Sequence, residues 1–205
     1  MPRRDPVPHD ILGEDRTLGG SRLYVDLVPS TCWGSAARST LTTQYEWKRI
    51  REMVYERAGQ ACEVCGNTRE DLEWAGYSRR LHAHERYEYL DDHVQRLGRL
   101  ICQCVACDEV THFGRTSTLG PDYENRAIAQ ALRVNGWTKA DFEDHLEEAR
   151  LVWEERSEHA WKLDVTVLRN AGGRIQESRT CVSEQWGGEP REIIWVPGPR
   201  SPAEG

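Results

Sequence analysis

The sequence has no long hydrophobic run. None of its apolar stretches approaches the roughly 20 residues that a membrane-spanning helix needs. No apolar segment of the kind found in secretory signals stands near its first residue. We therefore expect a soluble, cytoplasmic protein that has no membrane partner.

The chain also has no excess of positive charge. Its 27 lysine and arginine residues stand against 34 aspartate and glutamate residues, which gives a net charge of −7 and an isoelectric point near 5.6. Non-specific binding to a phosphate backbone depends on basic side chains that displace counterions. The balance therefore argues against a generic nucleic-acid binder, although a local basic patch can coexist with the acidity, which is concentrated in residues 143–158.

Phenylalanine is scarce, with two residues against eight tryptophans. Indole rings bury a large area and donate one hydrogen bond, so we expect most of the tryptophans to anchor the core or an interface. With 38% hydrophobic and 30% charged residues in a chain of 205, the composition is that of a globular protein of one domain or slightly more.

The chain does contain two C-x2-C pairs, Cys62/Cys65 and Cys104/Cys107. A two-residue gap lets one tight turn, or knuckle, offer two sulfur atoms to a single ion, and four thiolates satisfy tetrahedral Zn²⁺. Two disulfides could use the same residues, but disulfides persist in oxidising compartments and nothing indicates secretion. We therefore predict a structural zinc site. Three further cysteines stand outside it, namely Cys32, Cys102 and Cys181.

Composition divides the chain into three parts. Residues 1–22 carry prolines and glycines among charges, which predicts a flexible N-terminal arm. Residues 23–168 hold both cysteine pairs and most of the periodic segments. Residues 169–205 combine short apolar runs with a tail rich in proline and glycine. We expect an α+β fold: a small zinc-stapled module with a helical C-terminal half and short accessory strands.

Local patterns place the individual elements. Thr43 and Glu46 form a capping box ahead of a helical pattern that reaches Gly59. Polar and apolar residues alternate in the segment between the two cysteine pairs, which indicates a hairpin with strands over 80–89 and 94–101. The other expected elements are a short strand or extended segment at 24–28, a short helix at 108–112, helices at 121–134 and 139–161, and strands at 165–168 and 193–196.

Four short motifs carry a resemblance to a known family: LYVDLVP at 23–29, CEVCG at 62–66, HER at 84–86 and HFG at 112–114. The expected order is helix, knuckle, hairpin with histidines, second knuckle and short helix. This order resembles that of the HNH endonucleases, the ββα-metal group, in the form stapled by a four-cysteine zinc ribbon. The motifs are similar to those of a bacterial branch of HNH-like proteins, and the resemblance covers roughly residues 23–168.

The resemblance implies roles for three residues. His84 falls where the family has its general base, and neutral imidazole can deprotonate water near neutral pH. Asp108 and His112 fall where the family holds a catalytic metal, and at this spacing on a helix they share one face. The implied second ion is Mg²⁺, Mn²⁺ or Zn²⁺. The family often has a ligand before its base, where this chain has Ala83; His82 shares the strand face of His84.

The implied function is metal-dependent hydrolysis of phosphodiester bonds in nucleic acid, with DNA favoured. Two alternatives stay open: a metalloenzyme that acts on a small molecule, and a non-catalytic zinc-stabilised binding protein. If these residues have only structural roles, Asp108 caps a helix, His112 ends one, and the strand histidines face solvent. A basic rim around His84 would favour a phosphate substrate, and an apolar pocket lined by indoles a small molecule. The arginines expected in that rim are Arg79, Arg80, Arg86, Arg96 and Arg99.

Overall fold

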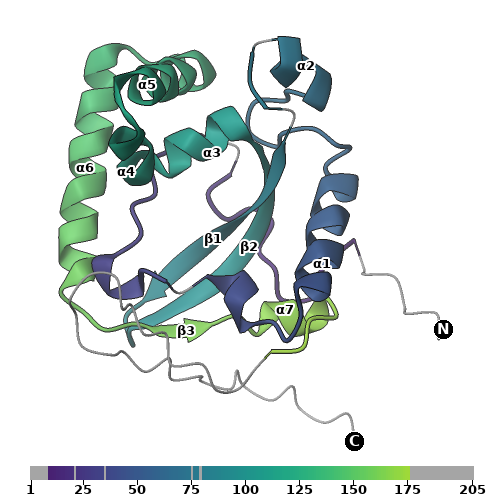
Figure 1. The fold of residues 1–205 in the computed structure, drawn as a ribbon. Coiled ribbons are helices and arrows are strands. Elements are labelled where there is room, and N and C mark those ends of the chain that lie inside the picture. Colours follow the sequence, from purple (N-terminus) through teal and green to yellow (C-terminus); the bar gives the residue numbers. More distant parts are fainter. Residues whose placement is uncertain (1–8, 21, 35, 75, 79, 176–205) are drawn as a thin grey trace, which may run out of the picture.

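A β-hairpin runs through the middle of the protein, with helices on either side of it (Figure 1). The structure is a computed structural model, and it describes residues 9–20, 22–34, 36–74, 76–78 and 80–175. The fold is mixed α+β with a small three-stranded sheet in the order β1-β2-β3. The elements are η1 Ser30–Cys32, η2 Ala37–Thr40, α1 Gln44–Arg57, α2 Arg69–Trp74, β1 Leu81–Leu90, β2 Val94–Cys104, α3 Val105–Thr111, α4 Phe113–Thr116, η3 Ser117–Leu119, α5 Pro121–Asn135, α6 Lys139–Ser157, β3 Lys162–Asp164 and α7 Val167–Asn170.

The hairpin β1–β2 is antiparallel, from the pair Leu81–Cys104 to the turn after Leu90. The hairpin expected between the cysteine pairs is thus confirmed, and its second strand runs on into the second knuckle. Because side chains alternate along a strand, His82 and His84 lie on the same side of β1. The hairpin therefore brings two histidines toward the helix that follows its second strand.

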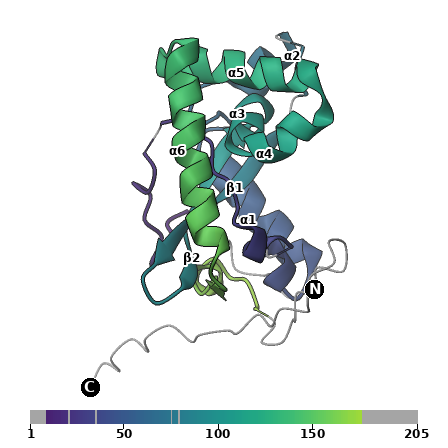
Figure 2. The same ribbon diagram turned by 90° about the vertical axis from the view of Figure 1, so that its left-hand side faces the viewer.

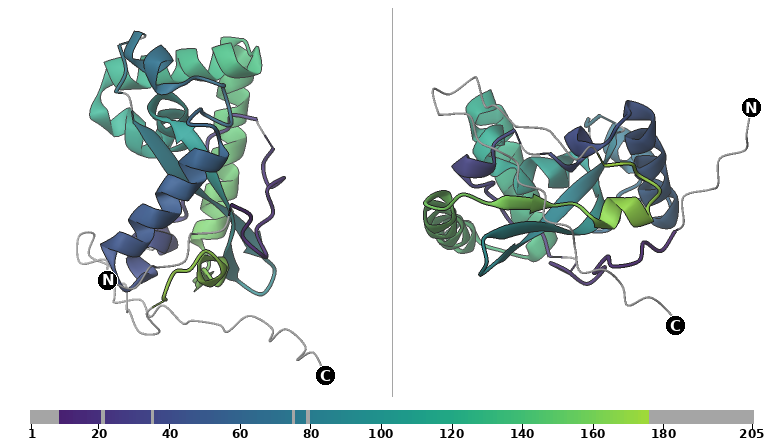
Figure 3. Two further views of the ribbon diagram at one scale, coloured as in Figure 1. Left: turned by 90° about the vertical axis from the view of Figure 1, so that its right-hand side faces the viewer. Right: turned by 90° about the horizontal axis from the view of Figure 1, so that it is seen from below.

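The helices form two groups around the hairpin. Helix α1 packs against both hairpin strands on one side, and α3 packs against both strands on the other. Helix α5 packs on α3, and α6 packs on α5 as the outermost helix of that group (Figure 2). Strand β3 joins β2 in parallel near the hairpin turn and leads to α7 (Figure 3). The core lies between these layers.

Local sequence fixes the start of α1. The side chain of Thr43 accepts a hydrogen bond from the backbone N–H of Glu46, and the carboxylate of Glu46 accepts one from the N–H of Thr43. The predicted capping box is therefore confirmed. Ile50 and Val54 on the buried face then hold the helix against the hairpin.

We expect Thr43→Ala to lower the free energy of unfolding by about 1 kcal/mol, because it removes the acceptor for an N–H of the first turn. Urea titration followed by circular dichroism measures the change. Lys48→Ala, an exposed position on the same helix, is the matched control and should stay near the wild-type value. An equal loss in the two variants would mean that the cap contributes nothing.

The helical C-terminal half follows the sequence pattern closely. Gly136 adopts a left-handed conformation that ends α5, and Thr138 forms a second capping box with Asp141 at the start of α6. Helix α6 ends at Ser157, short of the predicted limit at residue 161. The reason is a tertiary contact: the chain turns after Ser157 so that Trp161 packs edge-on against Tyr89, and β3 begins at the next residue.

Two expectations for the later strands change. Residues 165–168 do not form a strand; the strand precedes them as β3, and α7 begins at Val167. The side chain of Asp164 accepts a hydrogen bond from the N–H of Thr166, and this local turn ends the strand. Residues 24–28 form no strand, and the N–H of Asp26 donates to the carbonyl oxygen of Thr111 at the end of α3. The strand expected at 193–196 lies outside the described residues, as does Cys181.

Residues 9–20, part of the segment 1–22 that was expected to be a flexible arm, make contacts with the rest of the protein. Ile11 is buried, and the N–H of Asp15 donates to the carbonyl oxygen of Gly98 on β2. The carboxylate of Glu14 forms a two-pronged ion pair with Arg57 at the end of α1, with 2.6 Å in both N–O contacts. The charge of Glu14 is therefore an internal contact, although composition alone predicts that it faces solvent. None of the described helices is both long and apolar enough to cross a membrane.

Candidate metal centres

The four cysteines of the two knuckles meet at one point. Their sulfur atoms all lie within 4.8 Å of one another, and those of Cys65 and Cys104 are 3.7 Å apart. With Zn–S bonds of about 2.3 Å, the edge of a tetrahedron of sulfurs is about 3.8 Å. The six described cysteines form no disulfide. The cluster thus has the donors and dimensions of a metal site and is consistent with zinc.

The pKa values of the four clustered thiols diverge: those of Cys104 and Cys107 are raised above the usual range, and those of Cys62 and Cys65 are lowered. Hydrogen bonds from Cys104 and Cys107 hold the pKa of Cys65 far below its usual range and lower that of Cys62 to about 7. The side-chain amide of Gln130 on α5 donates to the sulfur of Cys107 at 3.2 Å. A cation among the four sulfurs would replace the protons that they otherwise share.

The other cysteine of the hairpin, Cys102, stands apart from this cluster. Cys102 is fully buried in β2, where burial raises the pKa of its thiol to about 12. Its sulfur is not one of the four that lie within 4.8 Å of one another. The structure therefore separates Cys102 from its neighbour Cys104, as the C-x2-C spacing predicts.

A second group of metal-ligating side chains lies where β1 faces the first turns after the second knuckle. Donor atoms of His84, Asp108 and His112 lie within 4.8 Å of one another. Oδ1 of Asp108 is 3.6 Å from Nδ1 of His84 and 3.8 Å from Nε2 of His112. Bonds of about 2.0–2.1 Å to one tetrahedral ion would place such donors about 3.4 Å apart, so a small closing movement suffices. The sequence expectation that these three residues gather is met in the structure.

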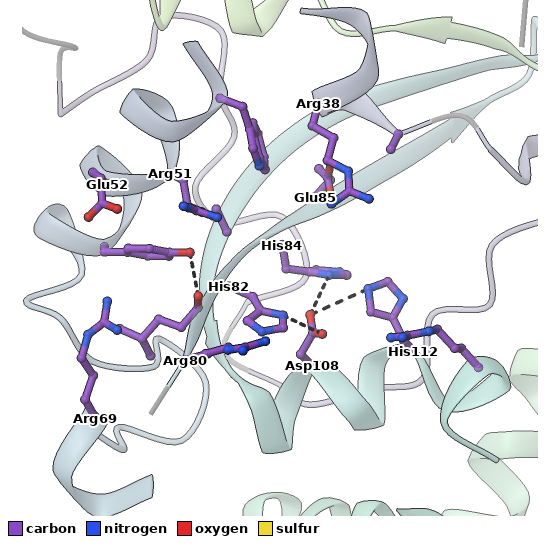
Figure 4. Close-up of a pocket in the computed structure, with 16 residues that line it drawn as sticks. Arg38, Arg51, Glu52, Arg69, Arg80, His82, His84, Glu85, Asp108 and His112 are labelled. Atoms are coloured by element: carbon purple, nitrogen blue, oxygen red, sulfur yellow. Dashed lines mark hydrogen bonds and ion pairs between the residues drawn. The ribbon is translucent and has the colours of Figure 1, made fainter. Parts of the chain in front are cut away.

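His82 lies beside this group and contacts its carboxylate. Its Nδ1 lies 2.8 Å from Oδ2 of Asp108, the oxygen that does not face the other two histidines. Sequence reasoning placed His82 on the correct strand face but gave it no partner, because the position of Asp108 across β1 depends on tertiary structure. Figure 4 shows Asp108 between the three imidazoles.

The protonation of the group suits cation binding. Burial alone would raise the pKa of Asp108, but hydrogen bonds from His82 and His84 and the nearby His112 hold it well below its usual range. Burial, reinforced by His84, lowers the pKa of His112. The carboxylate is therefore charged and His112 neutral at pH 7, which are the forms that ligate metals. Nε2 of His84 is buried without a hydrogen-bond partner, which is costly in a site that serves only stability.

The capping alternative for Asp108 is not what the structure shows. Helix α3 begins after Cys104, which makes no side-chain cap, and Asp108 lies within the helix with its side chain turned toward β1. His112 stands at the junction of α3 and α4, as a helix-end residue would, but its ring also packs edge-on against His84 with centroids 4.9 Å apart.

The His/Asp group opens into a pocket of about 970 Å³ (Figure 4). Its floor is β1, and its walls come from α1, α2, η2 and the α3–α4 junction. Three carboxylates line it, from Glu52, Glu85 and Asp108, and burial raises the pKa of Glu85. A single indole, that of Trp47, lines it among the described residues. Five arginines also line the pocket, namely Arg38, Arg51, Arg69, Arg80 and Arg115.

These arginines differ from most others in the described chain. Arg38, Arg51, Arg80 and Arg115 form no ion pair with any described residue. Outside the pocket, arginine–carboxylate pairs are common, as in Arg57–Glu14, Arg99–Glu63, Arg126–Glu109, Arg174–Glu46 and Arg96–Glu88. The pocket therefore has more arginines than carboxylates, five against three, although the whole chain carries a net charge of −7.

The arginine rim forms mostly from residues other than those expected. Of the four expected arginines that the structure describes, only Arg80 lines the pocket. Arg86 and Arg99 are buried and donate to the carbonyl oxygens of Leu18 and Gly20. Arg96 pairs with Glu88, and Arg79 lies outside the described residues.

Comparison of the chain with protein-family models, with curated proteins and with solved structures gives no match. The site is therefore interpreted from its own geometry.

Proposed function

We propose that the protein is an HNH-like, metal-dependent enzyme that hydrolyses phosphodiester bonds of nucleic acid. The observation that carries the proposal is the coincidence of a His/Asp/His donor group with four unpaired arginines in one pocket. The order of elements also supports the proposal. Strand β1 carries two histidines, β2 ends at the second cysteine pair, and α3 begins there, which is the order of a ββα-metal module. Arginine is suited to phosphate because its planar fork binds two oxygens at once.

The donor set fits a divalent cation. Two imidazoles and one carboxylate are ligands that Zn²⁺ and Mn²⁺ accept, and three protein donors leave positions for water and substrate. In this assignment His84, Asp108 and His112 hold the ion, which would polarise the phosphate and stabilise the departing oxygen. The four cysteines hold a separate structural zinc.

We assign the general base to His82 rather than to His84, where the family resemblance places it. The side chain of His84 is 4% exposed and belongs to the donor group, whereas that of His82 is 37% exposed and lines the pocket. The carboxylate of Asp108 can only accept a hydrogen bond, so the proton of His82 sits on Nδ1. Nε2 of His82 is then left free to take a proton from water. Asp108 thereby orients the base, as a carboxylate does for histidine in hydrolytic triads.

Two alanine variants separate the ligand from the base. We expect His84→Ala to lose Mn²⁺ binding, measured by titration calorimetry, together with cleavage. We expect His82→Ala to keep its Mn²⁺ affinity within a few fold while the rate of cleavage falls by about 10²–10⁴. His93→Ala, an exposed histidine at the hairpin turn, is the matched control and should behave as wild type.

Cleavage is measured on plasmid and on single-stranded oligonucleotides in Mg²⁺, Mn²⁺ and Zn²⁺. The reverse pattern, with metal binding lost in His82→Ala and kept in His84→Ala, would return the role of base to His84. Equal trace cleavage by wild type and both variants would indicate contamination and overturn the proposed function.

A further inference from the structure

The geometry points to single-stranded nucleic acid, rather than intact duplex, as the substrate of this pocket. The inference rests on the proposed function and specifies its substrate class. Three features of the described residues carry it: the depth of the donor group, the walls that surround it, and the placing of the unpaired arginines.

The donor group is recessed. The side chain of His84 is 4% exposed and that of Asp108 14%, while His82 and His112, at 37% and 36%, stand nearer the opening. A phosphate must therefore descend into the pocket before it reaches these residues. The substrate chain has to bend or enter by an end to deliver it.

The walls exclude a stiff double helix. Arg51 and Glu52 project from α1 on one side, Arg38 from η2 on another, and Asp108, with His112 just after it, stands on a third (Figure 4). The major groove of duplex DNA is about 12 Å wide and takes up one protein helix, so it cannot fit over walls that come from three separate elements of the protein. Duplex DNA also has a persistence length of about 50 nm and does not fold into a pocket of this size.

A single strand fits the same space. The volume of about 970 Å³ lies at the upper end of the roughly 300–1,000 Å³ typical of ligand pockets, which is room for a few nucleotides. Arg80 stands beside the His/Asp group in Figure 4, and Arg115 follows His112 by three residues on α4, whereas Arg38 and Arg51 stand farther along the pocket, on η2 and α1. Arginines spread in this way can meet successive phosphates, and their planar guanidinium groups can stack on unpaired bases.

Binding tests the inference separately from cleavage. Fluorescence anisotropy with labelled 12-nucleotide DNA and RNA strands, and with the duplex of the same sequence, is measured in EDTA-free buffer without added divalent metal, so that the thiolate-bound zinc stays in place. We expect at least tenfold tighter binding of a single strand than of the duplex, and the DNA and RNA arms show which sugar the pocket prefers. In Arg38→Gln/Arg115→Gln, the slope of log affinity against log salt should fall by about 1.4, since each phosphate contact on a single strand contributes about 0.7.

The matched control is Arg150→Gln, an exposed arginine on α6 that is paired with Glu147 and Glu154. It should leave affinity and salt slope unchanged, and the melting temperatures of both variants confirm that they are folded. Equal affinity for duplex and single strand, or equal affinity for a mononucleotide and the 12-mer, would overturn the inference. Metal-dependent cleavage of plasmid in the same preparations would at the same time leave the proposed function standing, whereas binding without cleavage of any nucleic acid would overturn that function.

Discussion

Replacing Cys104 with alanine will leave a protein that holds no tight zinc and does not fold. Cys104 ends β2, stands at the N-cap of α3, and contributes one of the four clustered sulfurs. In small zinc modules the free energy of zinc binding is about 10–16 kcal/mol. The free energy of unfolding of a whole domain is only about 5–15 kcal/mol, so losing the zinc is enough to unfold it. Elemental analysis for zinc and far-ultraviolet circular dichroism of the purified variant measure the outcome.

Cys102→Ala is the matched control for this experiment. Cys102 lies two residues earlier on the same strand, is equally buried, and stands outside the sulfur cluster. It should retain one equivalent of tightly held zinc and lose only the packing of one small side chain. A folded Cys104→Ala protein without zinc, or a wild-type protein whose four cysteines prove disulfide-linked by mass spectrometry, would contradict the zinc assignment.

The second large effect is expected at the ion pair between Arg57 and Glu14. Both side chains are almost fully buried, at 2% and 1% exposure, and they also bind the backbone of Leu100, whose N–H donates to Glu14 and whose carbonyl oxygen accepts from Arg57. Arg57→Met leaves a carboxylate buried without its partner, so the free energy of unfolding should fall by about 3–5 kcal/mol. Urea titration at pH 7 in zinc-containing buffer measures the change.

A double variant shows whether the lost charge balance is the cause. Glu14→Gln/Arg57→Met removes the stranded charge and keeps an acceptor for the N–H of Leu100, so it should be more stable than Arg57→Met alone. Arg150→Met serves as the exposed control, because surface ion pairs contribute only about 0–1 kcal/mol. If Arg57→Met, like the control Arg150→Met, lowers the free energy of unfolding by less than about 1 kcal/mol, the buried pair contributes little to stability.

The features that could be predicted from sequence are those set by residues close together in the chain. Thr43 and Glu46 define the start of α1 within one turn, and the C-x2-C spacing defines each knuckle without reference to the rest of the fold. Asp108 and His112 share a face because they are four residues apart. The proximity of these two residues to His84 came from the family resemblance, which supplied the long-range information that spacing lacks.

The features that were missed depend on tertiary contacts. The first described segment was expected to be loose, because a charged stretch rich in glycine gives no local sign that Glu14 has a buried partner more than forty residues later. The arginine rim was sought near His84 in sequence, yet it comes largely from η2, α1, α2 and α4. Arg86 and Arg99, although close to His84 in the hairpin, are turned toward the carbonyl oxygens of Leu18 and Gly20 instead.

One peptide bond joins the two candidate metal centres, since Cys107 belongs to the sulfur cluster and Asp108 to the His/Asp group. Each residue of an α-helix turns the chain by about 100°, so inserting or deleting a single residue at this junction would swing Asp108 away from β1 while the sulfurs stayed in place. The rotation of α3 about its axis therefore positions the ligands of both centres at once. Variation in length can accumulate elsewhere in the chain, but between Cys104 and His112 the spacing has to stay constant for both centres to exist together.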